Sequence, residues 1–362
     1  RSLMDRDLAV LNTISEMRDH QDWQRIRTDD TNPLTNRAIQ GYAPGSTYKI
    51  PIALAGLRAG LDEKSFSCYG GVQYGDKYMR CWIAEKKRTH GKLSLEDAIK
   101  VSCNAYFYQF GNAAGIEQIV AIGNMLGLGQ KSGIPISGES PGVLPGPEWL
   151  NNINPRARWS NGLTANTAIG QGDVLASPLQ MAVVTAALAN GGTVYYPRLI
   201  DRIVSQDGKV VQQDPPRVRS NLLTDAGLTA AQVNHVRQGM WCVVNEGGGT
   251  AGRAKNSEMP TAGKTGTAQF WRSGVKDNHT WFISFAPFEN PEYVVVVFVQ
   301  GAKSGGGVSA PIAAKILDGI QKYKSSKEDI QLAALEPAKG NFLFTESVDF
   351  GREVAAANKL FD

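Results

Sequence analysis

The chain has 362 residues, of which 42% are hydrophobic and 20% are charged, the composition of a globular protein and not of a disordered one. Its 38 basic and 34 acidic residues give a net charge of +4, which we interpret as too small and too dispersed for a protein that binds nucleic acid or a membrane surface. No apolar run reaches the roughly eighteen residues that a membrane span needs, and the first residues carry no signal-peptide pattern.

The first part of the chain has the pattern of helices separated by irregular segments. After a polar entry over residues 1–40, apolar residues at helical spacing predict a helix over 46–60. Residues 93–115 predict two helices broken near Ser102, where a chemically active side chain would be accessible. Residues 131–165 are rich in Gly, Pro, Asn and Ser, which predicts a long irregular connection of the kind that frames a site.

The middle of the chain has clearer helix boundaries. Ser177 as N-cap, Pro178 in the first turn and Gly191 just past the end predict a structural helix. Residues 193–213 predict a hairpin whose turn contains Asp207 and Gly208, and residues 225–245 predict another helix.

The strongest strand signals come late. "TAGKTGTAQF", "TWFISFAPF" and "YVVVVFVQ" predict an antiparallel meander, with a hydrophilic loop at 271–279 and a turn at 289–292. A closing helix follows, with Pro311 in its first turn. Helices, then strands, then a helix indicate an α+β fold with an antiparallel sheet flanked by helices.

Ser46 and Lys49 are candidates for a nucleophile and its base. Serine is a poor nucleophile unless a base lies within hydrogen-bond reach, and a lysine three residues later in a helix shares its face. The lysine must be neutral to act, which burial and a second nearby cation favour. The pattern by itself is weak, since it also fits an N-cap serine beside a solvated lysine, and Ser273 and Lys276 match it by chance in a polar loop.

Two further short motifs strengthen this interpretation. Ser102, Cys103 and Asn104 lie at the predicted helix break, and Lys264, Thr265 and Gly266 lie on the first strand of the meander. Ser-x-x-Lys, Ser-x-Asn and Lys-Thr-Gly in this order are a signature of enzymes that form an acyl-serine intermediate. A serine can relay a proton, an asparagine can bind an amide, and a lysine with a threonine can hold a carboxylate. Glycine on the strand would let a substrate lie against its edge.

With these motifs the sequence resembles the transpeptidase domain of class B penicillin-binding proteins, and most of all the elongation-type enzymes, penicillin-binding protein 2. The resemblance covers most of residues 32–320 and includes "NRAIQGYAPGSTYK", "HGKLSLEDAIKVSCNAYFYQFG", "AIGQGDVLASPLQMAVVTAALANGG", "AGKTGTAQ" and "HTWFISFAPFENPEYVVVVFV". It implies the penicillin-binding protein/β-lactamase-like fold, with an all-helical subdomain beside the sheet.

The resemblance also implies a mechanism. Ser46 would attack the penultimate D-alanine carbonyl of a peptidoglycan stem peptide ending in D-Ala-D-Ala, with Lys49 as base. The same catalytic group would include Ser102, Asn104 and Lys264, while Thr265, Gly266 and Thr267 would bind substrate. The backbone N–H groups of Ser46 and Thr267 would form the oxyanion hole. β-Lactams would acylate the same serine.

Family likeness extends to the domains, location and partners. We expect residues 1–31 to be an N-terminal remnant, 32–324 the transpeptidase domain and 325–362 a tail of unknown role. The strand pair that usually opens the domain is not recognisable in residues 1–30, and the chain begins at Arg1 without a methionine. We expect a membrane anchor to precede this segment, a location on the periplasmic face of the bacterial inner membrane, and a membrane glycosyltransferase and a scaffold protein as partners.

Three cysteines and one histidine form a separate candidate site. Cys68, Cys81, His90 and Cys103 suit tetrahedral zinc, although the usual Cys-x-x-Cys pair is absent. On spacing alone, a disulfide between Cys68 and Cys81 is favoured, with Cys103 and Cys242 buried as small apolar residues. The resemblance favours zinc, since some elongation-type enzymes hold a structural zinc in this loop, with a histidine and a cysteine at the positions of His90 and Cys103. Such a metal would fix the loop onto the second motif and take no part in the chemistry.

Three rival functions remain open. A serine β-lactamase shares fold and motifs but needs a group that activates water, and no clear candidate is present. A penicillin sensor or scaffold would bind without turnover. A Ser-His-Asp hydrolase is the weakest alternative, because none of the four histidines stands in a recognisable catalytic context.

Overall fold

The computed structural model of the chain describes residues 21–29, 32–256, 258–272 and 275–335. The chain divides into two units, residues 1–318 and 319–362; apart from the last helix, which extends into the second unit, the features below belong to the first. Among the described helices, none combines the length and the apolar character needed to cross a membrane.

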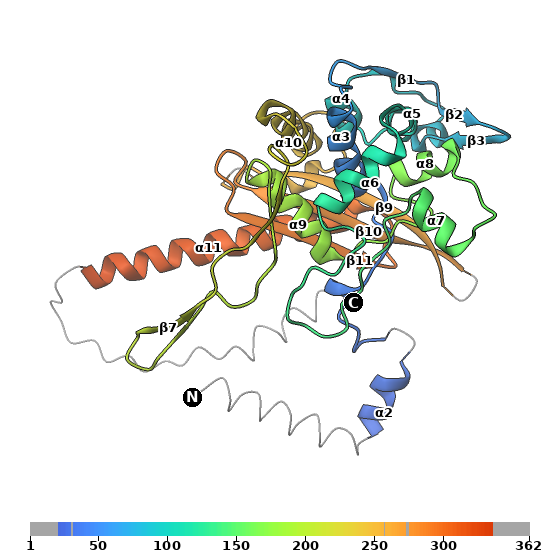
Figure 1. Cartoon of the computed structure of the whole chain (residues 1–362). Helices are drawn as coiled ribbons and strands as arrows, with labels where there is room; N and C mark the ends of the chain where they lie inside the picture. Colours follow the sequence, from blue (N-terminus) through green and yellow to red (C-terminus); the bar gives the residue numbers. More distant parts are fainter. Residues whose placement is uncertain (1–20, 30–31, 257, 273–274, 336–362) are drawn as a thin grey trace. The chain divides into compact units, whose positions relative to one another are not determined.

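The centre of the fold is a three-stranded antiparallel sheet in the order β11–β10–β9 (Figure 1). Its strands are β9 (Ala262–Arg272), β10 (Val275–Ala286) and β11 (Tyr293–Gln300), so the predicted meander is confirmed. The hydrophilic loop predicted at 271–279 is wrong for most of its length. Strand pairing joins backbone groups, so polar side chains such as Asp277 and Asn278 do not end it.

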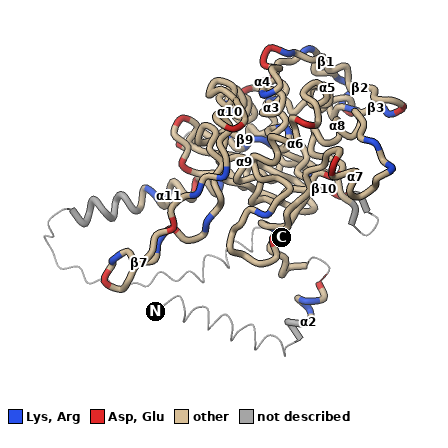
Figure 2. The backbone as a smooth tube through the Cα atoms, viewed as in Figure 1, with Lys and Arg blue, Asp and Glu red and all other residues tan. Residues whose placement is uncertain are grey.

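Two long helices pack on this sheet. Helix α9 (Pro178–Ala189) packs against β10 and β11, and α10 (Ala230–Asn245) packs against β9. Neither α9 nor β11 contains a charged residue, and both are tan in Figure 2. The predicted start of α9 is confirmed, because the Ser177 hydroxyl accepts from Gln180 N and the Gln180 side chain accepts from Ser177 N.

The remaining helices form an all-helical part beside the sheet. Within it, α3, α5 and α6 pack together and α8 packs on α5. The helices are α3 (Lys49–Arg58), α4 (Leu95–Lys100), α5 (Asn104–Ala114), α6 (Ile116–Met125), α7 (Pro147–Ile153) and α8 (Asn161–Ala168). A helical part beside an antiparallel sheet is the α+β fold that the sequence predicts.

The predicted irregular connection over 131–165 is wrong in part, because it contains α7 and the start of α8. Pro147 in the first turn and Ser160 as N-cap were the available signals. Helix α7 has no buried residue, so its sequence lacks the apolar periodicity on which helix prediction depends.

Short elements surround this core. The predicted hairpin turn at Asp207 and Gly208 is confirmed between β6 (Arg202–Val204) and β7 (Val210–Gln213), whereas β5 (Thr193–Tyr195) pairs with β8 (Val218–Asn221). The other short strands are β1 (Phe66–Cys68), β2 (Gly71–Tyr74), β3 (Lys77–Arg80) and β4 (Gly91–Leu93), paired β1–β4 and β2–β3. The other helical elements are α2 (Gln21–Thr28), α11 (Ala310–Leu335) and the turns η1 (Arg37–Ile39), η2 (Gly45–Tyr48), η3 (Trp82–Lys86), η4 (Gly252–Ala254) and η5 (Gly305–Ser309).

Three expectations fall wholly or partly outside the described residues. These are the missing strand pair in residues 1–30, the end of the tail at 336–362, and Ser273 of the second Ser-x-x-Lys match. The closing helix with Pro311 in its first turn is confirmed as α11.

Candidate active site

Ser46 lies in a tight turn against the sheet. The predicted helix over 46–60 begins later than expected, because Gly45–Tyr48 form the 3₁₀ turn η2 and α3 starts at Lys49. Gly45 has a φ of +53°, and a Cβ there would lie 2.7 Å from the carbonyl oxygen of Thr267. Glycine is therefore required before the serine, and the turn lies directly beside β9.

Lys49 is fully buried and points at the second motif. Its Nζ donates to the carbonyl oxygen of Ser102 (2.9 Å), to Ser102 Oγ (3.3 Å) and to Asn104 Oδ1 (2.7 Å). Ser46 is not among its hydrogen-bond partners in the described structure. Burial lowers the pKa of Lys49 to about 8. Negative charge on Cys103 and Cys81 acts in the other direction and raises this pKa, but by less. A neutral, proton-accepting form is therefore accessible near neutral pH.

The second motif occupies the break between α4 and α5, as predicted. Ser102 has a φ of +54°, a conformation that costs a non-glycine residue about 1–3 kcal/mol. Cys103 caps α5, its Sγ accepting from Tyr106 N at 3.3 Å. The next residue, Asn104, begins the helix, so the break aims Ser102 and Asn104 together at Lys49.

Trp82 supports this strained turn from outside the three motifs. Its Nε1–H donates to the carbonyl oxygens of Val101 (3.2 Å) and Ser102 (3.1 Å). Lys49 and Trp82 therefore share one acceptor at Ser102. Sequence reasoning missed Trp82, since nothing local indicates that a tryptophan after Cys81 reaches a carbonyl twenty residues later.

Lys264 brings a second buried cation to the same hydroxyl. The side chain is fully buried, and its Nζ donates to Ser102 Oγ at 2.8 Å and to the carbonyl oxygen of Thr265 at 3.1 Å. Burial, and secondly the charge on Lys49, hold the pKa of Lys264 well below its ordinary value. Two ammonium groups that converge on one buried hydroxyl repel each other, so the arrangement favours loss of a proton from the pair.

The rest of the third motif is held by neighbouring loops. Thr265 Oγ1 lies 2.7 Å from Thr250 Oγ1, and Gly305 N donates to Thr267 Oγ1 at 3.4 Å. A Cβ on Gly266 would lie 2.7 Å from the carbonyl oxygen of Pro44. The structure thus gives Gly266 a role besides the approach of substrate expected from the sequence, because this glycine makes room for the protein's own serine turn. Thr250 was also missed, its segment showing only a glycine-rich pattern.

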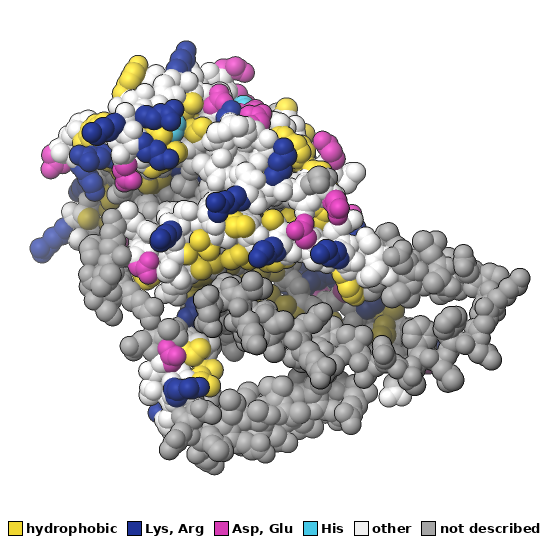
Figure 3. All heavy atoms as spheres, turned by 180° about the vertical axis from the view of Figure 1, so that it is seen from behind, with side chains coloured by type: hydrophobic (Ala, Val, Ile, Leu, Met, Phe, Trp, Pro, Cys, Tyr) yellow, Lys and Arg dark blue, Asp and Glu magenta, His cyan; other side chains and the backbone are white. Residues whose placement is uncertain are grey.

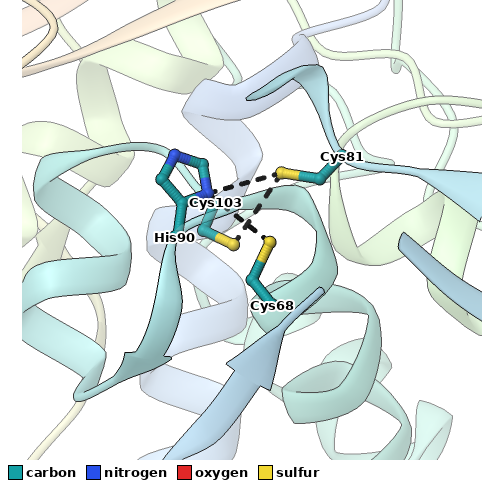
Figure 4. Close-up of side chains that lie close together, drawn as sticks. All are labelled: Cys68, Cys81, His90 and Cys103. Carbon is teal, nitrogen blue, oxygen red and sulfur yellow. Dashed lines mark hydrogen bonds between the residues drawn. The ribbon is translucent and has the colours of Figure 1, made fainter. Parts of the chain in front are cut away.

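The three cysteines and the histidine meet in one cluster beside the second motif (Figure 4). Their ligand atoms all lie within 4.8 Å of one another. His90 Nδ1 is 3.6 Å from both Cys68 Sγ and Cys81 Sγ, and Cys81 Sγ is 3.9 Å from Cys103 Sγ. All four cysteines of the chain are free thiols, so the alternative disulfide between Cys68 and Cys81 is not formed.

The cluster has the electrostatics of a site that shares one negative charge. The pKa of Cys81 is lowered, chiefly by its hydrogen bond with Cys103 and further by that with His90, and burial opposes this shift. The pKa of Cys103 is raised by its hydrogen bond with Cys81 and by burial. Cys242 lies elsewhere, buried, with its thiol 3.1 Å from Glu96 Oε1.

Comparison with known families agrees with this geometry. The model of the penicillin binding protein transpeptidase domain matches residues 8–318. The chain belongs to this family. The transpeptidase domain is 33% identical over 317 residues to the peptidoglycan D,D-transpeptidase MrdA of Haemophilus influenzae, covering 82% of this chain and 47% of the relative. It is 32% identical over 316 residues to MrdA of Acinetobacter baumannii, covering 83% and 45%.

Solved structures give the same assignment. Pseudomonas aeruginosa PBP2 in complex with WCK 5153 has a TM-score of 0.72 and 33% identity, with 83% of this chain and 63% of that one covered. Helicobacter pylori PBP2 in its complex with MreC has a TM-score of 0.69 and 30% identity, with 83% and 54% covered. The chain thus spans about half the length of the curated relatives, and the predicted resemblance and fold are confirmed.

Proposed function

We propose that this domain is the catalytic part of a peptidoglycan D,D-transpeptidase that acts in cell elongation and shape maintenance and is a target of β-lactams. The observation that carries the proposal is the convergence of two buried lysines, Lys49 and Lys264, on the hydroxyl of Ser102 beside the turn of Ser46. A buried cation pair of this kind is costly and is expected where a base with a lowered pKa is needed. The names of the relatives point to the same reaction.

In the acylation step, Ser46 Oγ bonds to the penultimate D-alanine carbonyl carbon of a stem peptide. Neutral Lys49 takes the serine proton, directly as Ser46 turns toward it or through bound water. The backbone N–H groups of Ser46 and Thr267 stabilise the oxyanion. Ser102 relays this proton from protonated Lys49 to the departing nitrogen, so the C–N bond breaks, terminal D-alanine leaves as an amine and Lys49 is neutral again.

The third motif and Asn104 orient the substrate in this proposal. Lys264 and Thr265 supply positive charge and a hydroxyl for the terminal carboxylate, and Asn104 binds a backbone amide. Within the described structure β9 pairs with β10 alone, so its other edge is available for an extended peptide to add as a strand. An amine of a neighbouring stem peptide then takes the acyl group from Ser46 and completes the cross-link.

We further propose that Cys68, Cys81, His90 and Cys103 hold a structural zinc ion. Zinc bonds of about 2.3 Å to sulfur and about 2.0–2.1 Å to nitrogen place tetrahedral ligand atoms about 3.6 Å apart for sulfur and nitrogen and about 3.8 Å apart for two sulfurs. The corresponding distances here are 3.6, 3.6 and 3.9 Å. The ion would fix the loop to the second motif through Cys103 and take no part in the reaction.

The whole protein's surroundings are also part of the proposal. By likeness to PBP2 in complex with MreC and to a peptidoglycan synthase complex that couples polymerization and crosslinking, we expect a scaffold protein and a membrane glycosyltransferase as partners. We accordingly propose a location on the periplasmic face of the inner membrane. We expect no nucleic-acid partner.

Intact-mass spectrometry after incubation with benzylpenicillin tests the nucleophile. We expect one stable covalent adduct on the parent protein and none on Ser46→Ala. Rapid hydrolysis of the drug without a lasting adduct would indicate a β-lactamase instead. An adduct without cross-linking of D-Ala-D-Ala stem peptides, in an assay with a donor and an amine acceptor, would indicate a sensor. Absence of any adduct would overturn the proposal.

Metal analysis of protein purified without added zinc tests the cluster. We expect about one zinc ion per chain, and its loss in Cys81→Ser but not in the control Cys242→Ser, which changes a buried cysteine outside the cluster. Four thiols titrating freely in folded protein with no bound metal would overturn this assignment.

A further inference from the structure

One short segment beside the second motif is rich in basic residues. Residues 76–92 contain six basic and two acidic residues, a net charge of +4 that equals the net charge of the whole chain. The basic side chains are Lys77, Arg80, Lys86, Lys87, Arg88 and Lys92, all exposed; we call them the basic surface.

The segment contacts the second motif of the active site. Cys81 and His90 are joined at 3.6 Å, and between them the turn η3 closes with Arg88 N donating to the carbonyl oxygen of Ile83. Ile83 is buried and Trp82 donates to Ser102, so the side of the segment that carries these two residues packs toward the second motif. The cations consequently lie on its outer side. Figure 3 shows Lys and Arg side chains gathered at the end of the molecule that carries β2 and β3.

Among the residues that the structure describes, the basic surface has no acidic partner. None of the ion pairs between described residues includes any of its six members, and one of them, Lys86, instead lies 5.2 Å from the centre of the Trp82 ring. Two large aromatic side chains beside it are exposed, Tyr69 by 78% and Tyr78 by 50%. A set of unpaired cations interleaved with exposed aromatic rings is a recognition surface for an anionic partner that also offers flat apolar faces.

We propose that the basic surface binds a peptidoglycan strand, with its cations on stem-peptide carboxylates and its tyrosines against sugar rings. The inference rests on the proposed function, since the polymer is the substrate of the adjoining site. A peptidoglycan strand fits better than a lipid membrane because the surface is attached through Trp82 to the catalytic turn, where the acceptor strand must arrive. Binding here raises the local concentration of acceptor at Ser46 without touching the reacting atoms.

Co-sedimentation with purified peptidoglycan sacculi tests the inference. The variant Lys86→Gln/Lys87→Gln/Arg88→Gln removes three charges of the basic surface. The control, Arg253→Gln/Lys255→Gln/Lys315→Gln, removes the same number and types of exposed charge from other elements. We expect the first variant to bind sacculi at least fivefold more weakly at about 0.1 M salt, and the control to bind within twofold of the parent. The difference should shrink in about 0.5 M salt, where screening is stronger.

Acylation by benzylpenicillin is measured on the same three proteins. This measurement distinguishes a failure of the proposed peptidoglycan binding from a failure of the proposed serine chemistry. Unchanged acylation with weakened sacculus binding is the expected result. If both variants weaken binding to sacculi equally, or if neither weakens it, the basic surface is not a peptidoglycan site, and the proposed serine chemistry is unaffected. Binding of phosphatidylglycerol vesicles in place of sacculi would overturn the choice of partner. No acylation of the parent would instead overturn the proposed function.

Discussion

Replacing Gly266 by alanine tests the contact between the third motif and the serine turn. A Cβ at this position would lie 2.7 Å from the Pro44 carbonyl oxygen, 2.9 Å from Thr47 Cγ2 and 3.1 Å from Trp281 Cβ, whereas ordinary contact begins at 3.4 Å. The turn must therefore retreat from β9 by about 0.7 Å. Overpacking of this kind costs about 1–3 kcal/mol of the free energy of unfolding.

The displacement acts on catalysis because the turn carries Ser46. A misplacement of about 1 Å costs on the order of 100-fold in rate, so we expect Gly266→Ala to slow acylation by benzylpenicillin at least tenfold. For a domain of about 300 residues, the loss of stability corresponds to a melting temperature about 2–5 °C lower. The matched control is Gly252→Ala, where a Cβ meets nothing within 4 Å, and both measurements should stay near those of the parent.

Stopped-flow acylation and thermal unfolding of the two variants distinguish two roles of Gly266, which are to make room for the serine turn and to let the ligand approach the strand. Slow acylation with lower stability supports the contact with Pro44. Slow acylation at unchanged stability would mean that the added methyl group contacts the ligand instead. That result is expected if the glycine lets a substrate lie against the strand edge, as the sequence predicts. Acylation within twofold of the parent at an unchanged melting temperature would show that the Pro44 contact does not set the position of the serine turn.

Three further predictions follow from the buried groups. Burial lowers the pKa of Lys49 to about 8, so its neutral form grows as pH rises and the acylation rate should increase about tenfold from pH 7 to a plateau near pH 9; a flat profile would rule out Lys49 as the titrating base. Trp82→Phe keeps the ring but removes the donor to Ser102, and should cost about 0.5–1.5 kcal/mol and slow acylation severalfold, which kinetics with a melting curve will check. Burial lowers the pKa of His279 to about 4 against the effect of Asp277. The unfolded state therefore binds more protons than the folded state between pH 6.5 and 4. The contribution of neutral His279 to the free energy of unfolding should be fully present above pH 6.5 and should be lost as the pH falls to 4. In denaturant titrations, His279→Phe should flatten this decline.

Features that depend on local chemistry can be predicted from the amino-acid sequence alone. The N-cap serine of α9, the Asp207–Gly208 turn and the valine-rich run of β11 are readable because capping, turn geometry and strand propensity act over a few residues. The three motifs are recognisable for the same reason, since each is a short string on one element. Spacing also named all four members of the cysteine and histidine cluster, although it left their chemistry open.

How distant residues act together depends on the tertiary packing and cannot be predicted from local sequence. Lys264 reaches the hydroxyl of Ser102 across 162 positions, and Trp82 reaches the same residue from outside every motif. The need for glycine at position 266 comes from Pro44, and the continuation of β9 and β10 comes from their mutual pairing. Such contacts depend on packing between elements far apart in the chain, and no local pattern encodes which surfaces the fold will bring together.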